Sequence, residues 1–373
     1  MQFQHNIRWF RSEVWLVACI CCVSLFHSAY ADTSTSHCEI ESGDIYSLYL
    51  QPMHKWPCYS ADREDLEPLP KPVEVEQALV SLGETLFHDK NLSSDRSVSC
   101  ASCHQPEHRF ADPRRISPGV EGREGHRNTP SLMNVDLWNV LFWDGRESSL
   151  QHLAVQPLTN PLEMNSNPGL AVMRVTEQDR YKALVEEYFG DSTITWQRIT
   201  EALAAFQLTL RSPENKLDTF LNAIADGNYE VAENALNSEQ LLGLHLFRTK
   251  ANCVACHQGA LLSDQKFHNM GLHYFGRRFE DLGVFAVNGE PSDVGKFRTP
   301  TLRHLEETRP WMHNGLFDDL LGIVRMYSHG GPRPRPRGEN INNPLFPVTT
   351  DELKPFNLTK EEEAALVEFL KVL

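Results

Sequence analysis

The stretches Cys100-Ala101-Ser102-Cys103-His104 and Cys253-Val254-Ala255-Cys256-His257 share the pattern Cys-x-x-Cys-His and lie about one domain length apart. In this pattern two thiols add across the vinyl groups of one porphyrin, and the following histidine is placed to bind the iron from one face. We therefore expect two covalently bound haems c, with His104 and His257 as proximal ligands. The alternatives are a disulfide within each pair or one structural zinc shared by the four sulfurs. Neither alternative requires a histidine directly after both pairs.

The chain of 373 residues is long enough for two domains of about 150 residues each. We expect an N-terminal extension over 32–75, a first cytochrome domain over 76–235 and a second over 236–373. The sequence Leu-Gly-x-x-Leu-Phe occurs before each motif, at 82–87 and 242–247. Apolar residues recur around it at helical spacing, which predicts an amphipathic helix before each haem motif and two domains related by duplication.

Further helices are expected over 196–210 and 360–372, where they would close the two domains. The second of these begins with the capping pattern Thr359-x-x-Glu362. Sustained period-2 alternation is absent, so strands should be few. Long loops rich in Pro, Gly and Asn, of the kind that covers porphyrins in haem domains, run over 113–130, 159–169 and 330–347. The expected fold is mainly α, with two c-type cytochrome domains, long loops covering the haems and few strands.

The first residues, 1–31, have the features of a secretory signal. Arg8 and Arg11 precede the apolar stretch 14–26, and the small-x-small site Ala29-Tyr30-Ala31 follows. We expect cleavage after Ala31 and export to the periplasm. The apolar stretch has thirteen residues and is too short to cross a bilayer, so no membrane span is expected.

The formal net charge is −15. An acidic surface disfavours nucleic acids and anionic membranes as partners, and it permits docking with a basic electron donor. Two cysteines of the exported chain, Cys38 and Cys58, lie outside the haem motifs. In an oxidising compartment they can form a disulfide that staples the N-terminal extension. The alternative is two free thiols in a mobile arm.

Beyond the haem motifs, the chain resembles the bacterial di-haem cytochrome c peroxidases and, more closely, the MauG-like branch of that family. The resemblance runs from about Leu79 to the C-terminus. It is carried by short motifs in a fixed order: Arg127-Asn128-Thr129-Pro130, Phe142-Trp143-Asp144-Gly145-Arg146, Pro157 with Glu163 in Pro-Leu-Glu-Met-Asn, Lys266-Phe267-His268-Asn269 and Trp311-Met312-His313-Asn314-Gly315.

This resemblance implies that hydrogen peroxide reacts at the first haem. Glu163 matches the family's acid/base, which takes a proton from bound peroxide and returns it to the departing oxygen. Pro157 matches a packing position in the same distal pocket. Leu153 stands where the peroxidases usually carry a glutamine, which leaves Gln151 and Gln156 as alternative hydrogen-bond donors.

Val120 marks a second departure from the peroxidases. Related enzymes that need prior reduction carry a histidine at this loop position, and it fills the sixth coordination site at rest. Valine cannot bind iron, so the resemblance implies a first haem that is five-coordinate or water-bound and open to peroxide. His108 and His126 lie in the same loop and remain alternative ligands.

The second haem is expected to take Tyr327 as its sixth ligand, as in MauG-like proteins. Tyr327 lies fourteen residues after His313, which the resemblance also assigns to this haem site, and it replaces the methionine of the peroxidases. A phenolate stabilises higher oxidation states of iron, whereas a thioether raises the reduction potential. Met326 is the adjacent alternative.

Two further roles are implied by the resemblance alone. Trp143 matches a tryptophan that lies between the haems, where an indole shortens the electron-tunnelling gap; the alternative is an ordinary core tryptophan. Asn128, Thr308 and Pro310 match positions that bind one Ca²⁺ through an amide and carbonyl oxygens.

A basic segment, Pro332-Arg333-Pro334-Arg335-Pro336-Arg337, stands out in this acidic chain. Its prolines make it stiff, and arginine pairs well with carboxylates. A solvated, extended loop is the usual role of such a segment; the alternative is contact with haem propionates or with an acidic face of a partner.

Together these features predict a periplasmic di-haem c-type peroxidase. It would reduce hydrogen peroxide with electrons from a small redox protein or from a protein substrate that becomes oxidised, as in MauG. The alternative is a di-haem electron-transfer cytochrome without peroxide chemistry, in which both irons would be six-coordinate.

Overall fold

The computed structural model describes residues 44–61 and 64–373. The expected signal peptide and Cys38 lie outside these residues. Cys58 lies within them and is disulfide-bonded. None of the helices in the described residues combines the length and the apolar character that crossing a bilayer requires.

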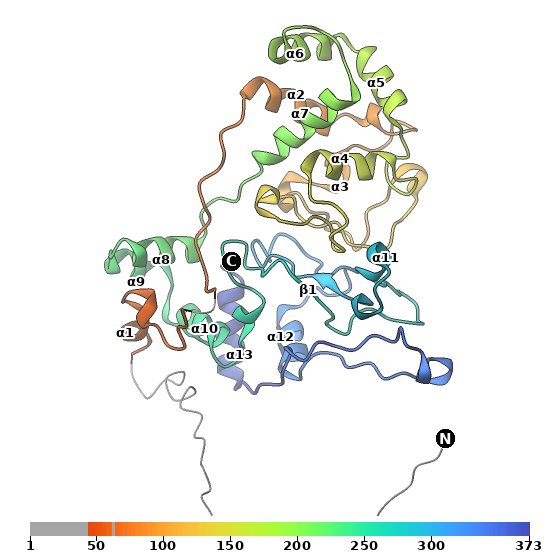
Figure 1. Ribbon diagram of the computed structural model, residues 1–373. Coiled ribbons are helices and arrows are strands. Elements are labelled where there is room, and N and C mark those ends of the chain that lie inside the picture. Colours follow the sequence, from red (N-terminus) through yellow and green to blue (C-terminus); the bar gives the residue numbers. More distant parts are fainter. Residues whose placement is uncertain (1–43, 62–63) are drawn as a thin grey trace, which may run out of the picture. The chain divides into compact units, whose positions relative to one another are not determined.

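The described chain is mainly helical, as expected (Figure 1). The α-helices are α1 (Ile45–Tyr49), α2 (Gln77–Phe87), α3 (Cys100–Cys103), α4 (Leu150–Thr159), α5 (Pro168–Thr176), α6 (Asp179–Phe189), α7 (Trp196–Leu208), α8 (Lys216–Ala225), α9 (Tyr229–Ala235), α10 (Ser238–Arg248), α11 (Phe285–Asn288), α12 (Leu320–Ser328) and α13 (Lys360–Leu370). Short 3-10 helices are η1 (Met53–Lys55), η2 (Lys90–Leu92), η3 (Pro106–His108), η4 (Val120–Gly122), η5 (Val135–Leu137), η6 (Cys253–Ala255), η7 (Pro291–Asp293) and η8 (Gly338–Asn342). Strands β1 (Phe267–His268) and β2 (Phe297–Arg298) form one antiparallel pair, with Phe267 opposite Arg298.

The helices expected before the two haem motifs are α2 and α10, and each packs against a later helix: α2 against α7, and α10 against α13. A Cβ atom added to Gly83 in α2 would lie 1.9 Å from the carbonyl oxygen of Ala202. One added to Gly243 in α10 would lie 2.1 Å from the carbonyl oxygen of Ala365. The glycine of the shared Leu-Gly-x-x-Leu-Phe sequence therefore allows a close helix crossing at both places.

Buried apolar side chains form two clusters. One draws on α2 and on α4 to α7, from Leu79 to Leu210. The other runs from Tyr49 to Leu373 and includes the buried faces of α8 and α9, from Leu217 to Leu236. The two clusters thus divide the chain after Leu210, whereas the sequence suggested a boundary after residue 235.

The N-terminal extension packs against α10. Tyr49 is fully buried, and its hydroxyl group lies 3.1 Å from Nδ1 of His245. The guanidinium of Arg248 donates from Nε to Asp65 at 2.9 Å. Residues of the expected extension therefore belong to the second apolar cluster.

Helix α13 begins with the expected capping box. The Thr359 hydroxyl accepts from the backbone N–H of Glu362 at 3.2 Å, and the Glu362 carboxylate accepts from the N–H of Thr359 at 2.7 Å. The pair satisfies two of the N–H groups that a helix start leaves without partners.

Candidate haem sites

The first Cys-x-x-Cys-His motif forms α3. Ser99 and Ser102 make a capping box at its start, with the Ser99 N–H donating to the Ser102 hydroxyl at 2.9 Å. His104 follows directly after the helix, and its Nδ1 lies 2.9 Å from the carbonyl oxygen of Phe110. Burial lowers the pKa of His104, so the ring is neutral. Donation from Nδ1 to this carbonyl leaves the Nε2 lone pair for a metal, as in most histidine-ligated metal sites.

The second motif repeats this arrangement. Cys253 begins η6, and Nδ1 of His257 lies 2.9 Å from the carbonyl oxygen of Leu262. Burial also lowers the pKa of His257. The accepting carbonyls belong to residues with positive φ, 56° at Phe110 and 52° at Leu262, a conformation that turns the chain back toward the histidine.

The four motif cysteines are not in disulfides, which contradicts the disulfide alternative. The shared zinc site is not supported either. In the described residues the group with ligand atoms close enough for one ion is Cys256, His268 and Glu352, which contains only one motif sulfur. His268 already bonds two carboxylates, Asp264 at 2.8 Å and Glu352 at 2.7 Å. The hydrogen bond to Asp264, with further help from Glu352, raises the pKa of His268 and favours the cationic ring over a neutral ligand.

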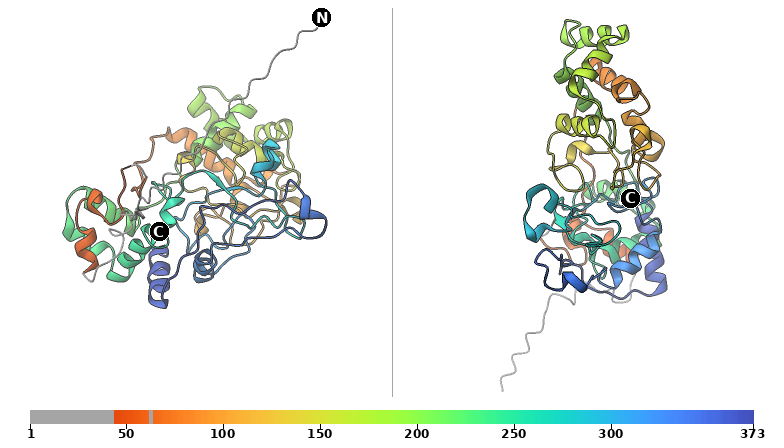
Figure 2. Two further views of the ribbon diagram at one scale, coloured as in Figure 1. Left: turned by 60° about the horizontal axis from the view of Figure 1, so that its bottom comes forward. Right: turned by 90° about the vertical axis from the view of Figure 1, so that its right-hand side faces the viewer.

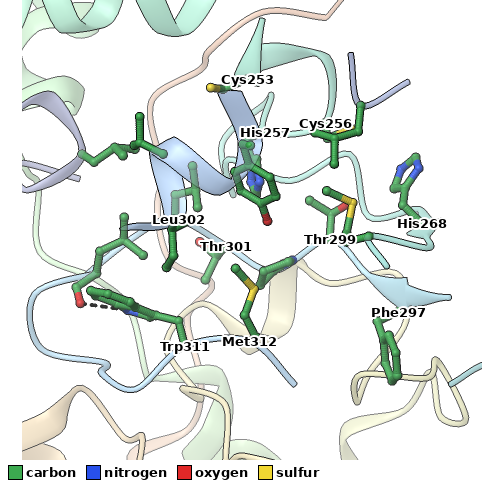
Figure 3. A pocket seen from close by; sticks show the side chains of 18 of the residues that line it. Cys253, Cys256, His257, His268, Phe297, Thr299, Thr301, Leu302, Trp311 and Met312 are labelled. Atoms are coloured by element: carbon green, nitrogen blue, oxygen red, sulfur yellow. Dashed lines mark hydrogen bonds between the residues drawn. The ribbon is translucent and has the colours of Figure 1, made fainter. Parts of the chain in front are cut away.

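A cavity of about 580 Å³ adjoins the second motif. Cys253, Cys256 and His257 line it, and Trp311 and Met312 lie across from the two cysteines in Figure 3. Its size falls in the range of small-molecule and cofactor pockets, and most of its wall is apolar.

Tyr327, in α12, lines this cavity, whereas Met326 does not. Burial raises the pKa of Tyr327, and the nearby thiols of Cys253 and Cys256 add to this effect. The free phenol therefore keeps its proton, and a bound cation would favour the phenolate. The geometry favours Tyr327 over Met326 as the residue available to a metal in the cavity.

Arg298 is a buried cation, and no carboxylate of the residues that the structure describes pairs with it. Its guanidinium stacks on Trp138, with Cζ 3.4 Å from the ring centroid, and Nη1 donates to the carbonyl oxygen of Val140 at 2.8 Å. Its Nε is buried and has no hydrogen-bond partner. Burial lowers its pKa to about 9. By contrast, the buried guanidinium of Arg303 forms two hydrogen bonds with Asp218.

Arg298 also lines the cavity beside the second motif. A buried charge is costly unless an opposite charge compensates it. Each haem carries two propionate groups, and an anion in this cavity would supply the missing partner. The cavity therefore fits a haem in three respects: a neutral histidine with Nε2 free, an oxygen ligand from Tyr327, and an uncompensated cation.

His313 and Trp143 both line the cavity. His313 is buried, its Nε2 has no partner, and burial lowers its pKa to about 4. Its ring stacks on Phe297 at a centroid distance of 3.7 Å and meets Trp143 edge-on at 6.4 Å. Trp143 Nε1 donates to the carbonyl oxygen of Asn128 at 3.0 Å, and the Asn128 N–H donates to that of His313 at 2.7 Å. The described structure thus brings together two aromatic residues that lie far apart in the sequence.

The residues expected to bind calcium also line this cavity: Asn128, Thr308 and Pro310. The Asn128 side-chain nitrogen donates to the carbonyls of Arg114 and Arg115, at 3.3 and 3.2 Å, which leaves its side-chain oxygen available to a cation. Amide and carbonyl oxygens are ligands that suit Ca²⁺.

Glu163 lies near the first motif. The residue is partly buried, and its carboxylate accepts a hydrogen bond of 2.6 Å from the Asn160 side chain. Burial raises its pKa, against the opposing effects of Asn160 and Arg146. The charge of Glu163 in turn contributes to the raised pKa values of Cys100 and Cys103, so the carboxylate and the motif thiols are close enough to interact.

The loop that carries Val120 is held against Glu163. Val120 is fully buried, and its N–H donates to the carbonyl oxygen of Glu163 at 2.8 Å. A Cβ atom on Gly119 would lie 2.1 Å from the carbonyl oxygen of Leu162, so the two chains touch. Pro157, in α4, accepts from the N–H of Met164 at 3.2 Å and helps to shape the same turn.

The expected alternative residues are placed less favourably. Gln151 and His126 are exposed, and Leu153 and His108 are partly buried. The Gln156 side chain donates to Glu147 at 2.6 Å. The amide that contacts Glu163 is Asn160, which the sequence analysis missed; an asparagine three residues before the carboxylate was the available signal.

Comparison with known proteins identifies the family of this chain. Residues 77–226 match the family model for di-haem cytochrome c peroxidase. A cytochrome-c peroxidase, IdrP1, from Pseudomonas sp. (strain SCT) is 33% identical over 340 residues, which cover 83% of this chain and 84% of that protein. The methylamine utilization protein MauG of Methylophilus methylotrophus is 34% identical over 312 residues, covering 82% and 84%.

Among solved structures, a MauG-like protein associated with microbial copper homeostasis superimposes with a TM-score of 0.72 and 28% identity, covering 84% of this chain and 95% of that one. The chain therefore belongs to the di-haem cytochrome c peroxidase family of oxidoreductases, which includes MauG and uses haem as its cofactor.

Proposed function

We propose that this protein is an exported di-haem peroxidase that reduces hydrogen peroxide at the site of His104. Electrons would come from a small redox protein or from a protein substrate that becomes oxidised as it donates them. They would pass through the site of His257. When bound, the two haems c would supply the redox-active irons that accept and pass on electrons.

Glu163 has the properties of the proton-transfer group at the first site. Its burial and raised pKa keep it able to change protonation at a higher pH than an exposed glutamate. In the proposed mechanism its carboxylate takes the proton from the near oxygen of peroxide and returns it to the far oxygen as water departs. Asn160 orients the carboxylate, since its side chain donates to Oε1. Val120 and Pro157 pack the surrounding turn and exclude water.

At the second site His257 and Tyr327 would hold the haem iron, and Arg298 would pair with a propionate group, because all three residues line the same cavity. Trp143 and His313 are proposed to carry electrons between the sites, because their rings meet at 6.4 Å. Such a contact offers a shorter tunnelling route than a gap filled by aliphatic side chains.

Several wider features are also part of the proposal. The two cytochrome domains arise by duplication, which is supported by the matching histidine–carbonyl bonds and by the matching glycine contacts of α2 and α10. The long loops cover the haems, and one Ca²⁺ binds at Asn128, Thr308 and Pro310. The signal over 1–31 directs the chain to the periplasm.

The observation that carries the proposal is the partly buried Glu163 carboxylate, which is close enough to the thiols of Cys100 and Cys103 to raise their pKa values. The experiment compares peroxide consumption by the haem-loaded wild type and the Glu163→Gln variant with a small organic electron donor. Glutamine keeps the shape but cannot transfer the proton, so we expect the rate to fall by ~10²–10⁴-fold. Glu124→Gln is the matched control, because Glu124 is exposed. An unchanged rate for Glu163→Gln, with both haems bound, would remove Glu163 from the mechanism.

A further inference from the structure

The chain between α12 and α13 forms a long loop whose base is tied to the second site. The N–H groups of Gly330 and Gly331 donate to the carbonyls of Tyr327 and Met326, at 2.8 and 3.1 Å. The returning segment of the loop is hydrogen-bonded to the same end of α12, because the Phe356 N–H donates to the carbonyl of Ser328 at 2.9 Å. In Figures 1 and 2 the loop, in blue, leaves α12, reaches out to η8 and returns.

The base of this loop forms part of the wall of the cavity beside His257, through Thr350, Glu352 and Leu353. Arg333 closes the base: its Nη2 donates to the carbonyl oxygen of Leu353 at 2.8 Å, and its Nη1 lies 3.8 Å from Asp351. One of the three arginines of the segment is therefore used for structure.

The remaining arginines, Arg335 and Arg337, are exposed at the outer part of the loop, where no carboxylate of the described residues pairs with either. Beyond them lie Ile341, 62% exposed, and Val348, 79% exposed. These two are the most exposed of the large apolar side chains in the described residues. We call Arg335, Arg337, Ile341 and Val348 the basic tip.

The basic tip is held in one geometry. Alternating prolines restrict the backbone of Arg335 and Arg337 to extended conformations. On the return, Phe346 packs against Phe275 at a centroid distance of 5.6 Å and against His273 at 6.2 Å. A surface ordered in this way loses little conformational entropy when a partner binds.

The loop segment 332–348 has a net positive charge, whereas the whole chain has a net negative charge. The chain carries −15, but residues 332–348 contain three arginines and one acidic residue, Glu339. Arg277 and Arg278 are also exposed and follow Gly276, where an added Cβ atom would lie 2.9 Å from the Asn340 side chain in η8. A partner with an acidic face would be attracted here and repelled elsewhere, which selects one docking orientation.

We propose that the basic tip is the docking surface for an acidic face of a small redox protein, which delivers electrons to the second haem. The loop carries exposed aliphatic side chains and exposed arginines together, which is the composition expected of an apolar contact with a charged rim. This inference rests on the proposed function and specifies the partner: an acidic donor, in place of the basic donor that the overall charge suggested. An anionic membrane is disfavoured because the rest of the surface is strongly acidic.

The test is electron transfer from a reduced, acidic c-type cytochrome into the di-haem protein after one equivalent of hydrogen peroxide has oxidised it, followed by stopped-flow absorbance. The variant is Arg335→Glu/Arg337→Glu. The matched control is Lys71→Glu/Arg96→Glu, which makes the same change in charge at two exposed residues elsewhere. We expect the second-order rate constant at low ionic strength to fall ~10–100-fold in the variant and to change little in the control. The wild-type rate should also fall as salt is added.

Three results would overturn the proposal: an unchanged rate in the tip variant, a faster reaction with a basic cytochrome than with the acidic one, or co-sedimentation with phosphatidylglycerol vesicles that the tip variant loses. Arg335→Gln/Arg337→Gln, which removes charge without reversing it, should give a smaller loss in the same direction. Peroxide turnover with tetramethylphenylenediamine, which needs no docking, should be equal in all variants. Absence of that turnover in the wild type would count against the proposed peroxidase function, whereas binding of the acidic cytochrome to the ferric protein, measured by isothermal titration calorimetry on the same variants, would still test docking.

Discussion

The two Cys-x-x-Cys-His sites are built alike on the histidine side and differently on the opposite side. In both, a neutral histidine donates from Nδ1 to a backbone carbonyl at 2.9 Å, and the carbonyl belongs to a residue with positive φ. Opposite the first motif stands a partly buried carboxylate, Glu163, while the second motif faces a largely apolar cavity with Tyr327. The comparison teaches that the attachment motif sets the proximal ligand only. The chemistry depends on side chains from other parts of the chain.

The charges at the two sites also differ in how they are balanced. Glu163 is an acid whose burial favours its neutral form, opposed by Asn160 and Arg146. Arg298 is a cation whose burial is opposed by no carboxylate. This difference is what the proposed functions require: proton transfer at the first site and an anionic ligand at the second.

The largest expected effect comes from making the second site resemble that of an ordinary electron-accepting cytochrome. Tyr327→Met should raise the midpoint potential of the second haem, because a thioether favours ferrous iron more than a phenolate does; axial ligands span a range of ~0.8 V. Spectroelectrochemistry of the purified holoprotein measures this. Met326→Leu is the control and should leave the potential unchanged. The reverse pattern would make Met326 the ligand.

A smaller effect should follow from removing the unpaired cation. Arg298→Met should lower the potential of the second haem by roughly 50–100 mV, which corresponds to ~1–2 kcal/mol of lost electrostatic stabilisation of the reduced form at an effective dielectric constant of about 20. Arg298→Lys keeps the charge and should restore most of the potential. If the Met and Lys variants shift the potential equally, Arg298 acts through packing against Trp138 rather than through its charge.

The smallest effect concerns the acidity of the first site. The Asn160 hydrogen bond lowers the pKa of Glu163, so its loss in Asn160→Leu should raise that pKa further. If the carboxylate is the base, activity is lost as the pH falls through its pKa, and the acidic limb of the pH–rate profile should move up by about one pH unit. Gln156→Leu is the control, because Gln156 bonds Glu147 instead. If the acidic limb of the pH–rate profile moves to lower pH, or does not move, Asn160 has no role in the proton transfer.

Local features of the fold could be predicted from the sequence. Helices α2, α10 and α13 lie where apolar periodicity and the Thr359–Glu362 capping pattern placed them. These predictions succeeded because helix periodicity and caps depend on residues a few positions apart. The assignment of α8 and α9 could not be made in the same way. Their apolar faces are compatible with either core, and only tertiary packing places them in the second cluster.

The same distinction between local sequence signals and tertiary contacts applies to the candidate sites. The motifs predict His104 and His257 as haem ligands. The resemblance of the chain to a known family suggested Glu163 and Tyr327. Arg298 was not identified, because an arginine becomes unusual only when every nearby carboxylate has been located and found to be absent or paired. The N-terminal extension was likewise undervalued: Asp65 and Arg248 are distant in sequence, and nothing local indicates their pairing.

The central claim is that one iron has an open coordination position while the other is closed by an oxygen ligand. Electron paramagnetic resonance of the ferric holoprotein, before and after addition of one equivalent of hydrogen peroxide, tests it most directly. The account predicts one high-spin and one low-spin signal at rest, and both should change when peroxide is added. Two low-spin signals that peroxide leaves unaltered would contradict it and would identify the protein as an electron carrier.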